Sequence, residues 1–210
     1  MEATGSTRER ALSSDKARRI VEAMRESVGE VGIAGSTFER VAAKAGVSRG
    51  LLHYYFGSKE KLLVEVIRRD TEIRISELGA ALESADSADE LIGAFFGMFE
   101  RTLSEGQGYV YMVSELFVAG RHSEELTREL GELYRTARVA FAAILERKEA
   151  EGVIKPRFSA DAVIAYLFAA GDGASVQMLS DPSYDVEAAV GVSYGVAQYL
   201  LTVPTSHARA

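Results

Sequence analysis

The stretch that decides the fold is STFERVAAKAGVSRGLLHYYFGSK, residues 36–59. Ser36 or Thr37 can cap a short helix whose apolar side chains share one face. Gly46 suits a tight turn because glycine tolerates positive φ, and Ser48 can cap a second short helix. Two short helices joined by a turn that contains glycine predict a helix-turn-helix motif, with an ordinary helical hairpin as the alternative.

The second helix of such a motif enters the major groove of DNA by its N-terminal end. There Arg49 can form a bidentate pair with a guanine, and Gly50 lets the backbone approach the bases. Leu51 can contact only a thymine methyl, whereas the polar side chains around it can donate to phosphates. The residues expected to contact DNA are Thr37, Arg40, Arg49, Gly50, Leu51, His53, Tyr54, Tyr55 and Lys59.

Charge is distributed unevenly along the chain. Residues 1–69 hold 13 Lys+Arg against 9 Asp+Glu, a balance of +4, and the remainder holds 11 against 22, a balance of −11, within a net charge of −7. A polyanion such as DNA would meet the basic head and be repelled by the acidic body. Chance variation between two solvated surfaces gives the same pattern, so the charge supports DNA as a partner without deciding it.

The composition excludes several classes of chemistry. The 210 residues include no Cys, which excludes disulfides, thiolate catalysis, zinc fingers and iron–sulfur ligation. The three His are far apart, and no nucleophile elbow, phosphate loop or zinc-protease motif occurs. We therefore expect no enzyme activity, no catalytic residues, no cofactor and no metal site.

The N-terminal residues are polar and do not resemble a secretory signal. The longest apolar stretches, such as Gly93–Phe99, are too short to span a bilayer. We expect a soluble cytoplasmic protein with no membrane partner.

Apolar residues recur at three- and four-residue spacing almost throughout, which predicts an all-α fold. Ser36 with Glu39, and Ser87 with Glu90, have the spacing of capping boxes and indicate where two helices begin. The expected helices cover residues 15–31, 37–44, 48–54, 59–83, 87–104, 108–120, 123–151, 159–180 and 183–201.

Residues 17–67 resemble the N-terminal domain of the TetR family of bacterial transcriptional regulators. The resemblance is strongest in the order AGVS-x-G … YF-x-SKE-x-L over residues 45–62, where a turn, two caps and a helix start fall in register. Family members usually have Thr where Leu51 stands and Tyr where His53 stands. These two departures imply an operator different from that of better-known members.

The rest of the chain resembles the BetI-like subgroup of this family more loosely. The resemblance lies in residues 169–173 (AAGDG), with Gln177 and Asp181 following. It implies a regulatory part that binds a small-molecule effector and forms dimers. The predicted organisation is a three-helix helix-turn-helix DNA-binding domain at 15–69 and a larger helical ligand-binding and dimerisation domain at 70–202, with flexible tails at 1–14 and 203–210.

In the resembled family the last two helices pair across a two-fold axis, so the resemblance implies a homodimer. Small residues at three- and four-residue spacing would permit this close approach, although packing within one chain would give the same pattern. A dimer would present two DNA-binding heads to major grooves about 34–36 Å apart, which requires an approximately palindromic operator. The expected interface residues are Ala169, Gly173, Val176, Gly191, Val192, Gly195 and Tyr199.

Large, polarizable side chains gather in the helices expected between 87 and 180. Such a set can line a largely apolar pocket with a few polar groups, or it can simply fill the core. The resemblance favours an effector site, with Glu115 as a further candidate polar contact. The expected pocket residues are Phe99, Tyr109, Met112, Phe117, Tyr134, Arg138, Phe141, Tyr166, Asp172 and Gln177.

The sequence thus predicts a homodimeric, ligand-responsive transcriptional regulator that binds double-stranded DNA. The leading interpretation is a repressor, whose free dimer holds an operator until an effector releases it. The helix expected at 59–83 joins the two domains and is the natural lever. A DNA-binding protein without a ligand is the alternative.

Overall fold

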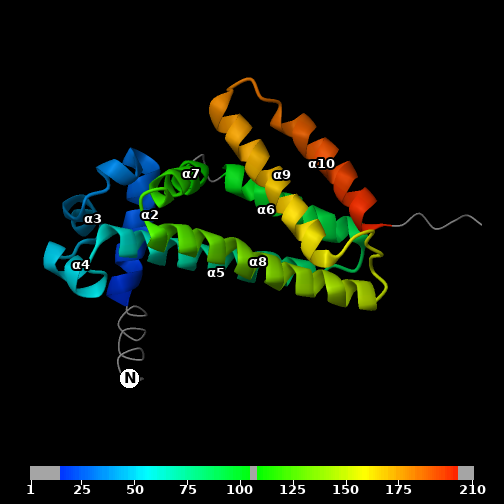
Figure 1. Cartoon of the computed structure of the whole chain (residues 1–210), viewed down its shortest axis with the longest axis horizontal. Helices are drawn as coiled ribbons and strands as arrows, with labels where there is room; N and C mark the ends of the chain where they lie inside the picture. The colour runs from blue at the N-terminus through cyan, green and yellow to red at the C-terminus, as the bar shows by residue number, and fades with distance from the viewer. Residues whose placement is uncertain (1–14, 105–107, 203–210) are drawn as a thin grey trace, which may run out of the picture. The chain divides into compact units, whose positions relative to one another are not determined.

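The computed structural model describes residues 15–104 and 108–202, and the side chains of residues 102–109 lie outside that description. Every regular element within these ranges is an α-helix, as the spacing of the apolar residues predicts (Figure 1). The tails predicted at 1–14 and 203–210 lie outside the described residues. The helices are α2 (Asp15–Gly35), α3 (Phe38–Ala45), α4 (Arg49–Tyr55), α5 (Lys59–Glu83), α6 (Ala88–Ser104), α7 (Gly108–Gly120), α8 (Glu124–Ala150), α9 (Ala160–Ser180) and α10 (Val186–Leu201).

The chain forms two compact units, and each unit combines two separate stretches of sequence. Unit 1 comprises Met1–Thr71 and Glu105–Leu133, and unit 2 comprises Glu72–Ser104 and Tyr134–Ala210. The predicted boundary after residue 69 lies close to the first of these joins. The prediction of two continuous domains differs from the structure, however, because α7 and the start of α8 belong with the N-terminal helices.

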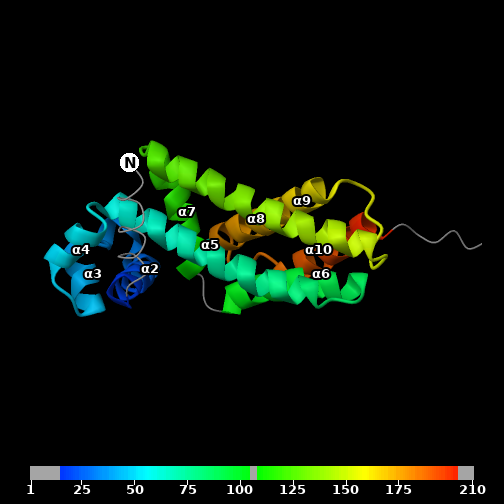
Figure 2. The ribbon, with the colours of Figure 1, turned by 90° about the horizontal axis from the view of Figure 1, so that it is seen from below.

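The core of unit 1 joins the N-terminal helices to α5, α7 and α8. Ile20 of α2 and Leu52 of α4 are fully buried in it, and so are Met112 and Leu116 of α7 and Leu126 of α8. α2 packs against both α3 and α7, and Figure 2 shows α7 beside α2. This packing joins residues about 90 positions apart in the chain, so the local sequence pattern did not indicate it.

Unit 2 is a helical bundle made from the second part of α5, α6, the rest of α8, α9 and α10. Its core contains Leu82, Leu91, Ile92, Leu145 and Ile164, all fully buried. α10 packs against α6 and α9. These helices bury their apolar stripes against one another, as expected for amphipathic helices in a bundle.

The segment after α8 ties down the end of α10. The backbone N–H groups of Lys155 and Arg157 donate to the carbonyls of Leu201 and Leu200, each at 2.9 Å. The Arg157 guanidinium also lies 4.3 Å from the centroid of the Tyr199 ring. Carbonyls in the last turn of a helix lack partners within that helix, so this segment satisfies groups that would otherwise need water.

Serine side chains begin several helices where the sequence predicts them. The backbone N–H groups three residues after Ser87 and Ser123 donate to the two serine Oγ atoms at 3.2 and 3.3 Å. α10 begins at Val186 rather than at residue 183, because the Asp185 carboxylate caps it by accepting the Ala188 N–H at 2.9 Å. An acceptor at this position satisfies one of the first free N–H groups of a helix.

The capping box predicted from Ser36 and Glu39 is wrong. Thr37 caps α3 instead, and its Oγ1 accepts the Arg40 N–H at 3.2 Å. Ser36 is fully buried, and its Oγ donates to the Gly32 carbonyl at 2.8 Å. The local spacing allows either Ser36 or Thr37 to cap α3. Because the Ser36 side chain is buried and bonded elsewhere, Thr37 is the cap.

α9 is the one described helix with the length and composition of a membrane span. The prediction that no apolar stretch is long enough is therefore wrong for Ala160–Ser180, because small residues make this helix apolar without forming a run of large side chains. A single such helix is weak evidence for a membrane, since core helices pass the same test. Little of α9 is buried within this chain, so its exposed face requires another explanation.

Candidate nucleic-acid interface

α3, a short turn and α4 form the predicted helix-turn-helix. α3 ends at Gly46, whose φ of 64° is left-handed and whose N–H donates back to the Ala43 carbonyl at 3.2 Å. The Arg19 guanidinium of α2 donates to the carbonyl of Ala45, at the same helix end. A glycine in this conformation ends a helix without strain, so the turn delivers the chain directly to Arg49 at the start of α4.

The N-terminal end of α4 faces solvent. Arg49 and Gly50 are exposed, and the nearest atom to a Cβ placed on Gly50 would be Ser48 Oγ at 4.0 Å. Tyr54 is 76% exposed, whereas Leu52 is fully buried. α4 is therefore anchored by one face and presents an arginine, an open backbone and a phenol on the other.

Carboxylates in unit 1 pair with the basic side chains of this surface. Arg49 pairs with Glu39 of α3, and Arg40 lies 3.4 Å from a carboxylate oxygen of Glu30. Lys44 is 2.7 Å from the other Glu30 oxygen, and hydrogen bonds from Lys44 and Arg40 lower the pKa of Glu30. Exposed pairs of this kind contribute little to stability, so the cations can exchange a carboxylate for a phosphate or a base.

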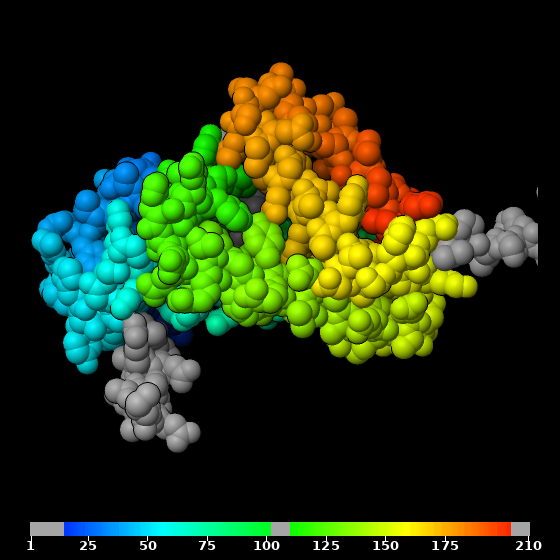
Figure 3. All heavy atoms as spheres, in the orientation of Figure 1, coloured from blue at the N-terminus to red at the C-terminus, as the bar shows by residue number. Residues whose placement is uncertain are grey.

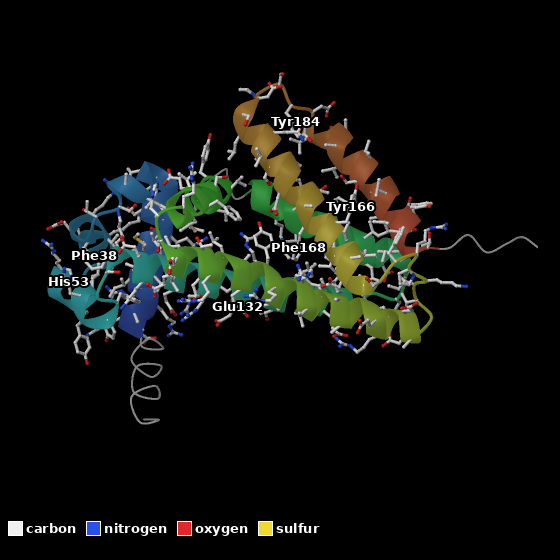
Figure 4. The ribbon with its side chains drawn as sticks, in the orientation of Figure 1. Phe38, His53, Glu132, Tyr166, Phe168 and Tyr184 are labelled. Atoms are coloured by element: carbon white, nitrogen blue, oxygen red, sulfur yellow. The ribbon has the colours of Figure 1, made fainter. Side chains whose placement is uncertain are left out.

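Two predicted DNA contacts have partners inside the protein. The Lys59 ammonium group donates to the Ile33 carbonyl at 2.9 Å and is half-buried. The His53 ring packs edge-on against Phe38, with centroids 4.8 Å apart (Figure 4). Lys59 thus holds the backbone ahead of α3, a structural role that the sequence pattern did not indicate.

Three further predicted contacts help to position the motif. Leu51 and Tyr55 are partly buried and pack against the core of unit 1. The hydroxyl of Thr37 serves as the cap of α3. The predicted contacts that are exposed are Thr37, Arg40, Arg49, Gly50, His53 and Tyr54.

An aromatic cluster in unit 2 contains part of the predicted effector site. The Phe168 ring of α9, labelled in Figure 4, lies 6.1 Å from the rings of both Tyr134 and Phe141 on α8. Phe99 of α6 lies beside Gly171, 3.9 Å from the position of a Cβ there. Edge-to-face contacts at this spacing are favourable between aromatic rings.

Asp172 places a carboxyl group at the edge of this aromatic cluster. The Tyr134 hydroxyl donates to Asp172 Oδ2 at 2.8 Å. Burial raises the pKa of the Asp172 carboxyl, and the hydrogen bond from Tyr134 opposes that effect. A carboxyl and a phenol beside apolar rings are the kind of polar groups that orient a largely apolar ligand.

The pH dependence of stability should reveal this environment. A raised pKa in the folded state means that folding favours the protonated acid, so the free energy of unfolding falls as the pH rises through the native pKa. Asp172→Asn removes the titration and should flatten this slope, measured by chemical denaturation at several pH values. Tyr134→Phe removes the opposing hydrogen bond and should shift the slope to higher pH. Identical slopes in all three proteins would contradict the assignment.

Four residues proposed as effector contacts belong to unit 1, whereas this cluster belongs to unit 2. Met112 is buried in the core of unit 1, and Phe117 is 46% exposed. Glu115 accepts a hydrogen bond from the Ile33 N–H. The Tyr109 side chain lies outside the described residues.

Three predicted pocket residues of unit 2 lie at its surface. Arg138 donates from Nε to Asp161 at 2.6 Å, and Tyr166 is 47% exposed. Gln177 is exposed, and its side-chain amide donates to the Gly173 carbonyl of its own helix, at 3.4 Å. Helical spacing did not indicate which of these aromatic and polar residues point inward.

Small and apolar residues form an exposed stripe on α9 and α10. Val176 is 58% exposed and Val192 is 69% exposed. A Cβ on Gly173, Gly191 or Gly195 would meet nothing within 4 Å. Figure 3 shows both helices, in orange and red, with no other segment over them on that face. The exposed stripe comprises Ala162, Tyr166, Ala169, Gly173, Val176, Ala188, Gly191, Val192, Gly195 and Tyr199.

A short helix that presents its N-terminal end to solvent, after a glycine turn and on a buried helical core, defines a helix-turn-helix protein. Residues 20–66, which include this motif, match the TetR_N family, described as bacterial regulatory proteins of the tetR family. The N-terminal part of the chain thus resembles the DNA-binding part of the TetR family.

Known relatives and solved structures agree with this assignment. The chain is 27% identical over 113 residues to the HTH-type transcriptional regulator BetI of Brucella canis, over 54% of this chain and 57% of that protein. It therefore spans about half the length of the curated relatives it matches. A TetR transcription regulator from Haloarcula marismortui has a TM-score of 0.75 at 20% identity, over 90% of this chain and 99% of that chain. FadR from Bacillus subtilis, solved in complex with stearoyl-CoA, has a TM-score of 0.70 at 20% identity, over 86% and 97%.

The two solved structures extend the fold assignment to most of the chain, including the larger helical part. All of these proteins are transcriptional regulators, which agrees with the prediction that this chain is not an enzyme.

Sequence reasoning missed the contacts by which three side chains support the site. Glu39 lies ten residues before Arg49, and the geometry of the motif brings these positions together. Arg19 and Glu115 contact the backbone 26 and 82 residues away, and no local pattern signals such contacts.

Proposed function

We propose that this chain is a dimeric transcriptional regulator that binds operator DNA and responds to a small-molecule effector. The observation that carries the proposal is the exposed end of α4, where Arg49, Gly50 and Tyr54 project from a helix anchored by Leu52. The match of residues 20–66 to the TetR_N family supports the same function.

The exposed residues divide into two roles at a duplex. Arg49 reads a guanine through two parallel hydrogen bonds, and Gly50 allows the backbone to approach the bases. Arg40 and Tyr54 contact phosphates and fix the register of α4 in the major groove. The balance of +4 over residues 1–69 attracts DNA to this end of the chain.

A second copy of the same chain covers the exposed stripe on α9 and α10. The stripe has no charged side chain, and its glycines leave open space for a partner helix. When the stripe of one chain packs against the same stripe of a second chain, the interface is two-fold and buries Val176 and Val192. Two linked heads then bind an approximately palindromic operator, with half-sites about 34–36 Å apart.

The effector binds at the aromatic cluster of unit 2. Phe99, Phe141 and Phe168 offer apolar rings, and Tyr134 with Asp172 offers a polar pair. This chemistry suits a largely apolar molecule with one polar group. FadR from Bacillus subtilis was solved with stearoyl-CoA, which joins a long apolar acyl chain to a polar group, and this supports a ligand with an apolar part.

The free dimer acts as a repressor in the cytoplasm, where it occupies its operator and blocks transcription. The effector prefers the conformation that does not bind DNA, and the coupling between two such sites is typically about 1–3 kcal/mol. A ligand of this strength therefore lowers operator affinity by roughly 5- to 150-fold.

The proposal is tested by selecting bound DNA from a random pool and then screening metabolites for release of the selected site. We expect an enriched near-palindrome with a guanine in each half-site, and one ligand class that lowers affinity. No enrichment at low salt would overturn DNA binding itself. An enriched site that no ligand releases would instead identify a regulator that lacks an effector.

A further inference from the structure

The backbone near the C-terminal end of α2 is held from both sides at one residue, Ile33. The Ile33 N–H donates to the Glu115 carboxylate of α7, in a partly buried hydrogen bond. The carbonyl of the same residue accepts a hydrogen bond from Lys59 Nζ of α5 at 2.9 Å. Side chains of α5 and α7 thus both bind the backbone of Ile33, just before the helix-turn-helix.

A glycine makes this approach possible. Gly32 interrupts the helical conformation of α2 with φ 73° and ψ 171°. A Cβ at this position would lie 2.6 Å from one carboxylate oxygen of Glu115, which is closer than real Cβ contacts. Both the left-handed φ and the space occupied by the carboxylate therefore require glycine.

The position of the Glu115 carboxylate is fixed by the packing of α7. Met112 and Leu116, three residues before and one after Glu115, are 2% and 1% exposed in the core of unit 1. The carboxylate therefore reaches the backbone from a helix anchored in the core rather than from a loop. Hydrogen bonds to a charged acceptor are stronger than those between neutral groups.

The segment that follows leads directly into α3. The Ser36 hydroxyl bonds to the Gly32 carbonyl at 2.8 Å and to Ser27 Oγ at 2.9 Å, and both serines are fully buried. Thr37 then caps α3. The junction is therefore held by hydrogen bonds along its length, and the contact at Ile33 helps to set the direction of α3 relative to α2.

We propose that Glu115 is a positioning residue for DNA binding, whose carboxylate holds the α2–α3 junction in the geometry that α3 and α4 need to dock on a duplex. This role rests on the proposed function, although the contact itself does not. Glu115 acts through the Ile33 backbone and does not touch DNA.

The experiment compares Glu115→Ala, Glu115→Gln and Glu129→Ala in the full chain. Glutamine keeps a carbonyl oxygen that accepts the Ile33 N–H, whereas alanine leaves no acceptor. Glu129 is the matched control, because its carboxylate also lies in unit 1 and accepts hydrogen bonds from Arg68 at 2.9 and 3.1 Å. Two quantities are measured: hydrogen exchange at the Ile33 amide, and affinity for the selected operator.

In Glu115→Ala the Ile33 amide should exchange about ten- to a hundredfold faster, as expected for loss of a hydrogen bond to a charged group. Operator affinity should fall about tenfold or more. Glu115→Gln should retain operator affinity within about threefold, and Glu129→Ala should leave both the Ile33 exchange rate and operator affinity unchanged.

Three results would overturn the proposal. Rapid hydrogen exchange at the Ile33 amide of the unaltered protein would show that the contact with Glu115 is absent. This measurement does not depend on whether the alanine variant folds. Faster exchange with unchanged operator affinity would make the contact structural only. Equal losses of affinity in Glu115→Ala and Glu129→Ala would point to general destabilisation. Failure of the unaltered protein to bind any DNA would instead refute the proposed function, while the exchange result would still test the contact.

Discussion

Replacing Val192 with aspartate should give a folded monomer that has lost about 10²- to 10⁴-fold in operator affinity, the range by which linking two binding heads raises affinity. Val192 is 69% exposed, so the substitution disturbs no packing within the chain. In the proposed dimer the new carboxylate would be buried without a cation, which is strongly unfavourable. Light scattering measures the mass in solution, and fluorescence anisotropy measures operator affinity.

Val139→Asp provides the matched control. Val139 is 62% exposed on α8 in the same unit, but it lies outside the α9–α10 stripe. This variant should remain dimeric and bind the operator normally. A Val192→Asp protein that stays dimeric would place the interface elsewhere. An unaltered protein that is monomeric in solution and binds lipid vesicles would assign the α9 face to a membrane instead.

Replacing Arg49 with alanine should weaken operator binding by about 1–3 kcal/mol, or roughly 5- to 150-fold, and relax the base preference at one position of each half-site. The guanidinium is exposed and pairs with an exposed carboxylate, so its loss should leave the fold intact. The measurement is the affinity of this variant for four operators, which carry each of the four bases at the position identified by selection.

The decisive result is non-additivity between Arg49→Ala and replacement of the preferred guanine, because each change removes the same contact. Arg121→Ala is the control, since Arg121 is an exposed arginine of unit 1 beyond the end of α7. It should cost little operator affinity and leave base preference unchanged. Equal losses on all sequences for Arg49→Ala would reduce its role to a phosphate contact.

Local signals in the sequence predicted most of the fold. Apolar spacing and caps such as Ser87 and Ser123 placed helices within a few residues, because helix starts depend on groups three residues away. Gly46 marked the turn of the helix-turn-helix, because a left-handed backbone conformation favours glycine at that one position. The division into units was not predictable in this way, because Met112 and Leu116 join a core formed by residues distant in sequence.

In the candidate sites, too, contacts within one motif could be predicted from the sequence, whereas contacts between distant residues could not. The exposed set around Arg49 came from the order of residues within one motif. The pairing of Tyr134 with Asp172 joins residues 38 positions apart on two helices, and helical spacing alone indicated neither this pair nor the pair of Arg138 and Asp161. Lys59 was expected at a phosphate because it begins a helix. Its bond to Ile33 was not predictable, because the two residues are 26 positions apart.

The tie between residues 155–157 and the end of α10 has a practical consequence for studying assembly. Because backbone and guanidinium groups of this segment secure the carbonyls of Tyr199, Leu200 and Leu201, α10 ends at a fixed anchor. A fluorophore joined just after Thr202 would therefore start from a defined point on unit 2. Energy transfer between two differently labelled copies would then report their separation directly, and would follow any rearrangement that a ligand causes.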